Sequence, residues 1–141
     1  MAEQTYDLNF NGYPLESNIG NLPAQSGIYG VYACTYNQIA NTVNLRKLIY
    51  IGESGNVRER VEDHEKWPDW RGELQKGENI CFNYALISPG ADRKRAEAAM
   101  IYEHKPTCNT EYVDEFPFDT TTINTEGRNE FMKSRFTVHR T

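Results

Sequence analysis

Residues 27–52, GIYGVYACTYNQIANTVNLRKLIYIG, contain the two segments that decide the fold expected for this chain. Residues 28–35 are rich in β-branched and aromatic side chains and residues 47–52 are nearly all apolar, which is typical of strands. The segment between them, residues 37–44, is polar and suits a hairpin loop. Two strands joined in this way are most simply an antiparallel hairpin.

A helix is predicted directly after the hairpin, over residues 55–66. Val57 and Val61 lie four residues apart there, so both fall on one helical face that can be buried. Trp67-Pro68 is expected to end this helix, because the residue before a proline avoids the α region.

A third strand and a second helix follow. Residues 80–88 alternate well enough to predict a strand, and residues 92–104 consist largely of good helix formers. Pro106 is expected to stop the second helix. Together these elements predict an α+β domain, in which a small three-stranded antiparallel sheet is flanked by helices.

The two ends of the chain are harder to interpret. Residues 1–26 are polar and interrupted by glycine and proline, which predicts an irregular N-terminal arm. Residues 27–110 are expected to form the domain, and residues 111–141 a C-terminal extension packed on or near it. Within this extension, residues 120–124 suggest a short strand and residues 129–136 a helical turn.

Length and composition limit the class of protein. A chain of 141 residues fits one domain and can bury a conventional core. Hydrophobic residues make up 38% and charged residues 25%, which are ordinary globular values. The formal net charge of −5 argues against a protein that holds nucleic acid by bulk electrostatics alone.

The sequence also indicates a compartment. No apolar stretch approaches the roughly 20 residues that cross a bilayer, and the N-terminus carries no secretory signal, so no membrane association is expected. The cysteines Cys34, Cys81 and Cys108 are odd in number and far apart, without a CxxC pair. We therefore expect reduced thiols in a cytoplasmic protein, with no zinc site.

Five short elements occur in a fixed order along the chain: GIY at 27–29, YIG at 50–52, Arg60, Glu97, and a KPxxN stretch that ends at Asn109. In this ordered set the chain resembles the GIY-YIG nuclease family over about residues 26–110. The resemblance implies a metal-dependent endonuclease that hydrolyses phosphodiester bonds in DNA and uses Mg²⁺ or Mn²⁺. RNA is not excluded as a substrate.

Glu97 is the predicted metal ligand. Met100 and Ile101 follow it by three and four residues, which suggests that Glu97 lies on a helix face turned toward the protein. A carboxylate there is costly unless it is paired or metal-bound. One carboxylate plus waters and phosphate oxygens suits Mg²⁺. The alternatives are a solvated helix charge or an ion pair with Arg93 or Arg60.

Arg60 offers a permanently charged fork for a phosphate. The alternative is a surface ion pair with Glu62 or Glu53. Tyr29 and Tyr50 lie on neighbouring predicted strands, and the resemblance implies that both belong to the active site. We expect Tyr29 to accept a proton and Tyr50 to position water, although two tyrosines packed in a core are the alternative.

His64 and Asn109 complete the predicted catalytic set. His64 lies one turn after Arg60 and can relay a proton or contact the phosphate, since histidine titrates near neutral pH. Asn109 follows the expected helix stop and can hydrogen-bond the backbone or the substrate. The alternative for Asn109 is a plain turn residue after Pro106.

Weaker signals concern substrate contacts. Ser54 can help to form an anion site at a helix N-terminus. Trp70 and Arg71 can stack on bases or wedge between them, unless the tryptophans clamp the first helix. Basic contacts are expected from three further residues, namely Lys105, Lys133 and Arg135.

No separate DNA-reading domain is recognisable, so specificity is expected from a homodimer or a separate specificity subunit. The alternative function is a catalytically silent module with the same fold that binds nucleic acid or regulates a partner. The intact set of Tyr29, Tyr50, Arg60, Glu97 and Asn109 favours the enzyme.

Overall fold

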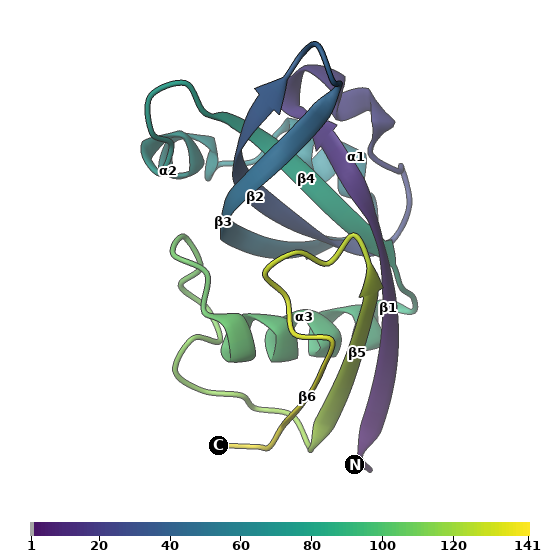
Figure 1. Cartoon of the computed structure of the whole chain (residues 1–141). Coiled ribbons are helices and arrows are strands. Elements are labelled where there is room, and N and C mark those ends of the chain that lie inside the picture. Colours follow the sequence, from purple (N-terminus) through teal and green to yellow (C-terminus); the bar gives the residue numbers. More distant parts are fainter. Residues whose placement is uncertain (1) are drawn as a thin grey trace.

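A six-stranded mixed sheet organises the chain, and it curls strongly from one edge to the other (Figure 1). The structure is a computed structural model that describes residues 2–141. The strand order is β3-β2-β4-β1-β5-β6, in which the pairing of β1 with β5 is parallel and the other pairings are antiparallel. The strands are β1 (Gln4–Leu15), β2 (Gly27–Asn37), β3 (Thr42–Ser54), β4 (Asn79–Leu86), β5 (Thr121–Gly127) and β6 (Arg135–Val138).

The expected small three-stranded antiparallel sheet flanked by helices is therefore wrong. The three predicted strands are present as parts of β2, β3 and β4, and they pair antiparallel. Three further strands extend them on the β4 side, and few helices cover the result. The predicted sheet is one half of the observed one.

β1 is the element that the sequence interpretation missed. The irregular arm expected over residues 1–26 is wrong for residues 4–15, where Tyr6, Leu8 and Phe10 are buried and the residues between them are exposed. This alternation is the period of a half-buried strand, although polar residues dilute it. β1 is long enough to pair with β5 through residues 4–10 and with β4 through residues 11–15.

The helices are short except for one. They are α1 (Val57–Glu62), α2 (Trp67–Gly72) and α3 (Gly90–His104), with a 3₁₀ segment, η1 (Glu16–Asn21). The predicted helix over residues 55–66 stops at Glu62, and Pro68 opens α2 rather than ending α1. Proline suits the first turn of a helix, where its missing N–H has no partner to lose. Asn56 caps α1, because its Oδ1 accepts the Glu59 N–H at 3.1 Å.

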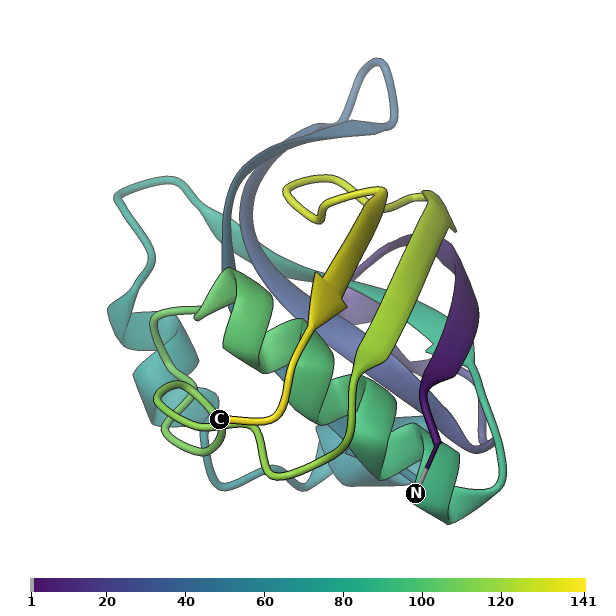
Figure 2. The ribbon, with the colours of Figure 1, turned by 90° about the horizontal axis from the view of Figure 1, so that it is seen from below.

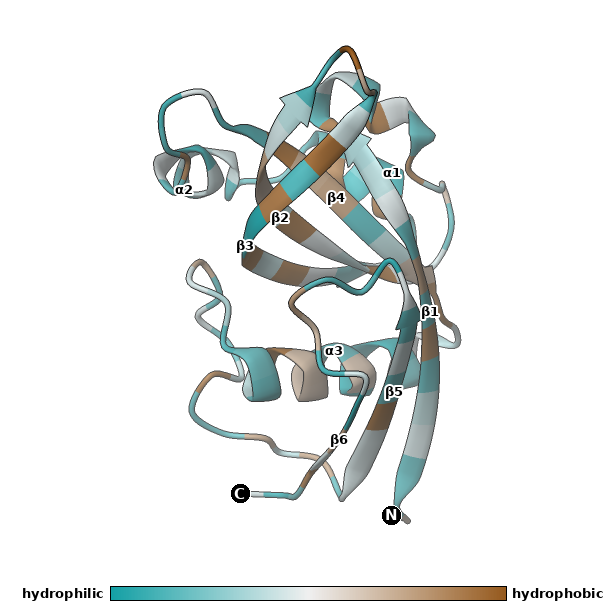
Figure 3. Cartoon of the chain, viewed as in Figure 1, coloured by the Kyte–Doolittle hydropathy of each residue, from teal (hydrophilic) through white to brown (hydrophobic). Residues whose placement is uncertain are grey.

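Two apolar clusters lie on the two faces of the sheet. α3, β5 and β6 close one face, which we call the α3 side and which includes Ile28 and Tyr32 (Figure 2). The short helices α1 and α2 close the other, the α1 side, which includes Tyr29 and Val31. Apolar bands cross β2, β3 and β4 in Figure 3, as expected for strands that are buried on both faces.

The C-terminal residues belong to the same core. The expected strand at 120–124 is observed as part of β5, whereas the helical turn expected over residues 129–136 is wrong at its end, where residues 135 and 136 begin β6. Buried Arg95 of α3 donates to Thr121 Oγ1 at 2.8 Å and to the carbonyls of Asp119 and Thr120 at 3.0 Å each. These bonds tie α3 to the start of β5.

Among residues 2–141, no helix combines the length and the apolar character that crossing a bilayer requires.

Candidate active site

A pocket of about 240 Å³ opens at the β3 edge of the sheet, where residues from both faces meet. Five of the six predicted catalytic residues line it: Tyr29, Tyr50, Arg60, Glu97 and Asn109. The other lining residues are Glu53, Glu65, Lys66, Ile101, Thr110 and Glu111. The edge position matters, because only there can α1 and α3, which lie on opposite faces, contribute side chains to one pocket.

Two glycines of the sequence signatures have a steric explanation. A Cβ at Gly52 would lie 2.3 Å from Tyr29 Oη, so the Tyr29 ring can cross this position only because it carries no side chain. A Cβ at Gly27 would lie 2.6 Å from the Ala85 carbonyl oxygen. Both glycines therefore permit close packing around β2, and Gly52 directs the Tyr29 hydroxyl toward the pocket.

The two tyrosines are neutral phenols in the free protein. Tyr29 is buried and its ring centroid lies 6.3 Å from that of Tyr50. Burial, followed by the nearby Tyr50, raises the pKa of Tyr29 well above its usual value, while Arg60 acts in the opposite direction. Burial and then Glu97 raise the pKa of Tyr50 to about 12, again opposed by Arg60. Neither phenol accepts a proton until positive charge favours the phenolate.

Arg60 forms a two-pronged ion pair with Glu65, at 2.8 Å from Nη1 to Oε2 and 2.9 Å from Nη2 to Oε1. The partner is thus neither Glu62 nor Glu53, the two alternatives predicted. This pair holds the pKa of Glu65 at about 2. Because Glu65 is exposed to solvent, a phosphate can replace it on the guanidinium with little loss of energy.

Glu97 is the carboxylate without a partner. Its two predicted ion-pair partners are engaged elsewhere, since Arg60 pairs with Glu65 and Arg93 pairs with Glu53. Within residues 2–141 the Glu97 carboxylate has neither a hydrogen bond nor an ion pair. Burial, followed by the negative charges of Glu53 and Glu111, raises its pKa to about 8.

This environment fits a divalent cation. Glu97 is half-buried, and a partly desolvated carboxylate beside other negative charges is costly when ionised and unpaired. A cation relieves both the desolvation penalty and the repulsion. No cluster of three or more His, Cys, Asp and Glu side chains suited to a metal ion occurs in the part of the chain that the structure describes. A metal bound here would take Glu97 as its protein ligand and fill its other positions with water or phosphate oxygens, as Mg²⁺ commonly does.

Glu53 has a structural role that the sequence did not reveal. It forms an ion pair with Arg93, and Arg93 Nη1 also donates to Ser26 Oγ at 2.9 Å. The pair joins the end of β3 to α3, so that Glu97 is left free.

His64 lies behind the pocket rather than in it. Its ring is buried, 5.2 Å from the Tyr50 ring and 4.7 Å from the Trp70 ring between centroids. Nδ1 accepts the Lys66 backbone N–H at 3.0 Å, and burial followed by Arg60 lowers the pKa to about 4. His64 is therefore neutral near pH 7 and packs against the Tyr50 ring. It does not line the pocket in which a proton relay or a phosphate contact was expected.

Asn109 closes the free edge of β3. Its Oδ1 accepts the Ile51 N–H at 2.9 Å, and its Nδ2 donates to the Ile51 carbonyl at 2.9 Å. The neighbouring Cys108 N–H donates to the Ile49 carbonyl at 2.9 Å. Of the predicted alternatives, the backbone hydrogen bonds are observed, and they hold β3 and its Tyr50 against the loop after α3.

The predicted substrate contacts on the α1 side are taken up by the protein. Ser54 Oγ bonds the backbone of Asn56 in the turn before α1. Trp70 is fully buried in α2, so its ring cannot stack on a base; the clamp alternative is the one observed. Arg71 lies over the Trp67 ring, at 5.0 Å from its centroid, and pairs with Glu16.

The three basic residues near the C-terminus lie outside the pocket lining. Lys105 Nζ is 3.9 Å from the centroid of the Tyr102 ring. Lys133 pairs with Glu103, and Arg135 donates to Asn124 Oδ1 at 2.7 Å. These partners leave no unpaired cation at these positions.

Four charged pocket residues were not predicted from the sequence: Glu53 as a lining residue, Glu65, Lys66 and Glu111. Glu65, five positions after Arg60, and Glu111, two after Asn109, belong to no sequence pattern that would predict a place in the pocket. Comparisons of the chain with protein-family models, with curated proteins and with solved structures find no match.

Proposed function

We propose that this protein is a metal-dependent endonuclease that hydrolyses phosphodiester bonds in DNA. The observation that carries the proposal is the meeting of Tyr29, Tyr50, Arg60 and Glu97 in one pocket, although they come from separate elements of the chain. The ordered motifs shared with GIY-YIG nucleases support the same activity. RNA is the other polymer that this chemistry can cut.

Each residue has a role in the proposed reaction. Arg60 exchanges Glu65 for the scissile phosphate and neutralises the charge that grows on its oxygens. Glu97 would hold Mg²⁺ or Mn²⁺, and the ion would supply further charge stabilisation at the phosphate and the leaving oxygen. Tyr50 orients the attacking water. Tyr29 first loses its phenolic proton to solvent, and the phenolate then accepts a proton from that water. Arg60 favours this ionisation, because it opposes the burial that raises the pKa of Tyr29.

A second candidate is a catalytically silent module that binds nucleic acid or regulates a partner. Two observations favour it, namely the net charge of −5 and the occupation of Arg60 by Glu65. The unpaired Glu97 opposes it, because a binding module gains nothing from a half-buried carboxylate without a partner.

Cleavage of supercoiled plasmid, branched DNA and single-stranded RNA with Mg²⁺ or Mn²⁺ tests the choice. Glu97→Gln is the test variant, and Glu115→Gln, at an exposed position outside the pocket, is its matched control. We expect the parent and the control to cleave and Glu97→Gln to be slower by roughly 100-fold or more. Folded parent protein that cleaves none of the substrates would overturn the proposal in favour of the silent module.

A further inference from the structure

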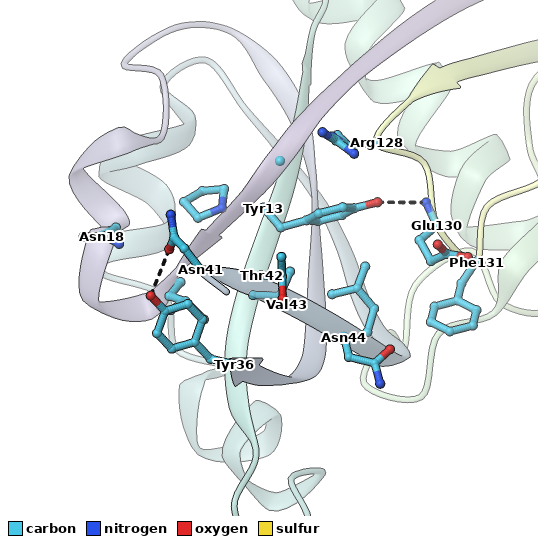
Figure 4. Close-up of a pocket in the computed structure, with 14 residues that line it drawn as sticks. Tyr13, Asn18, Tyr36, Asn41, Thr42, Val43, Asn44, Arg128, Glu130 and Phe131 are labelled. Carbon is cyan, nitrogen blue, oxygen red and sulfur yellow. Dashed lines mark hydrogen bonds between the residues drawn. The ribbon is translucent and has the colours of Figure 1, made fainter. Parts of the chain in front are cut away.

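A second cavity, of about 650 Å³, is shown in Figure 4. It is walled by the end of β1, the far end of the β2–β3 hairpin and the loop before β6. Val43 and Leu45, which line it, pack with the α3-side cluster, whereas Tyr29 and Tyr50 pack with the α1-side cluster. The cavity and the active-site pocket have no lining residue in common, so substitutions can address each separately.

Phe131 is presented to this cavity by a loop held in a strained conformation. Its side chain is 48% exposed, and its φ of 62° lies in the left-handed region that bulky residues rarely adopt. The preceding residue is fixed on both sides, since the Glu130 N–H donates to Tyr13 Oη at 3.1 Å and Tyr32 Oη donates to the Glu130 carbonyl at 2.7 Å. The protein therefore holds an aromatic ring in solvent at a conformational cost.

Arg128 provides positive charge at the same place. It is the only arginine among residues 2–141 whose guanidinium has no hydrogen-bond or ion-pair partner. Its backbone is fixed, because its N–H donates to the Phe10 carbonyl at 2.9 Å and its carbonyl accepts from Asn83 Nδ2 at 2.8 Å. An unpaired guanidinium on a rigid backbone is suited to a phosphate group.

Asparagine amides also line the cavity, with Asn18 and Asn41 at one end and Asn44 nearer Phe131 (Figure 4). Asn41 Oδ1 accepts the Tyr36 hydroxyl at 2.9 Å, which Figure 4 shows at the hairpin end of the cavity. The amides of Asn18 and Asn44 have no protein partner among the described residues. Each amide carries both donors and an acceptor, the combination that pairs with the edge of a nucleobase.

We propose that this cavity binds an unpaired nucleotide of single-stranded nucleic acid, with the base on Phe131, its edge toward the asparagine amides and a phosphate on Arg128. The volume lies within the roughly 300–1,000 Å³ of pockets that hold small ligands, whereas a stacked duplex cannot enter such a hollow. A neutral sugar would use the ring and the amides but would leave the guanidinium without a role. The choice of nucleic acid rests on the proposed function.

Binding is measured without cleavage, on the full chain carrying Glu97→Gln in the presence of a chelator. The probe is a short fluorescein-labelled single strand of mixed sequence, followed by fluorescence anisotropy, with the matching duplex and an uncharged oligosaccharide as competitors. Phe131→Ala and Arg128→Gln are the test variants. Leu86→Ala, at another exposed apolar position, and Lys76→Gln, at another exposed cation, are their matched controls.

We expect Phe131→Ala to weaken single-strand binding about tenfold, as for loss of one stacked base, and Phe131→Tyr to restore it. Arg128→Gln should lower the slope of log affinity against log salt by about 0.7, the value for one phosphate of a single strand. The controls should match the parent. Equal binding by both test variants and their controls, or competition by the oligosaccharide but not by nucleic acid, would overturn the inference.

The two proposals fail separately. Cleavage by the parent without single-strand binding at this cavity would disprove only the proposed nucleotide site. Phe131-dependent binding without cleavage of any substrate would disprove only the proposed hydrolytic activity.

Discussion

Replacement of Glu97 by glutamine should make the metal-free protein less sensitive to alkaline pH. The pKa of Glu97 is about 8 in the folded protein and 4.5 for an unperturbed carboxyl. Because the folded value is the higher one, the unfolded chain releases this proton first as the pH rises. The stabilisation is complete below pH 4.5 and is lost as the pH rises through 8.

The size of the effect follows from the shift. One pKa unit corresponds to about 1.4 kcal/mol, so the parent should lose about 4 kcal/mol of unfolding free energy between about pH 4.5 and 8. Glutamine has nearly the same shape and does not ionise, so the Glu97→Gln protein should lose none of this amount. For a chain of this length the difference corresponds to roughly 10 °C in Tm near pH 8.

Urea unfolding in a chelator at about pH 5 and pH 8 measures this difference. The informative quantity is the change in stability with pH, parent against variant, which cancels any general effect of the substitution. Glu115→Gln, exposed and outside the pocket, should follow the parent at both pH values. Added Mg²⁺ or Mn²⁺ should raise the Tm of the parent at pH 8 but not that of Glu97→Gln. Identical pH dependence in parent and variant would refute the reasoning about an unpaired, half-buried Glu97.

Three further predictions test the surroundings of the pocket. Gly52→Ala places a Cβ 2.3 Å from Tyr29 Oη, so it should destabilise the fold by about 1–3 kcal/mol and abolish cleavage, whereas Gly20→Ala, which meets nothing within 4 Å, should cleave normally. The pKa of His64 falls from 6.5 to about 4 on folding, so neutral His64 stabilises the folded state fully above pH 6.5, and this stabilisation is lost as the pH falls to about 4. Urea unfolding should show a loss of about 3 kcal/mol in unfolding free energy for the parent, and His64→Gln should not show it. Glu65→Gln removes the two-pronged ion pair of Arg60, so it should lower the KM for cleavage several-fold at unchanged kcat. An unchanged KM would show that Glu65 does not compete with the phosphate for Arg60.

The candidate site was predictable because its residues carry local patterns. The two tripeptides, Arg60, Glu97 and Asn109 follow one another in order, and all five elements contribute to one pocket. For Asn109 the sequence predicted two alternative roles, since nothing in it says whether the amide hydrogen-bonds the substrate or the backbone of Ile51. Trp70 misled for a related reason, because an aromatic residue in a polar stretch looks the same whether it is buried or exposed.

The fold was half predictable. β2, β4 and residues 48–52 of β3 are buried on both faces and stand out from their surroundings, whereas β1 buries only every second residue and is interrupted by Gly12 and Pro14. Its partner β5 lies more than a hundred residues further along the chain. The sequence around β1 contains no pattern that indicates a parallel pairing with so distant a strand.

The sequence by itself determined the hairpin, the third strand, the long helix and the identity of five of the eleven pocket residues, because strand and helix periods and short motifs are local properties. Only the tertiary structure decided three other features: which carboxylate is left without a partner, that His64 lies behind the pocket, and that Arg128 and Phe131 share a second cavity. Each of these features depends on which side chains from distant segments of the chain lie next to a given charge or surface in the folded protein. The packing between elements determines these neighbours, and local sequence patterns do not contain that information.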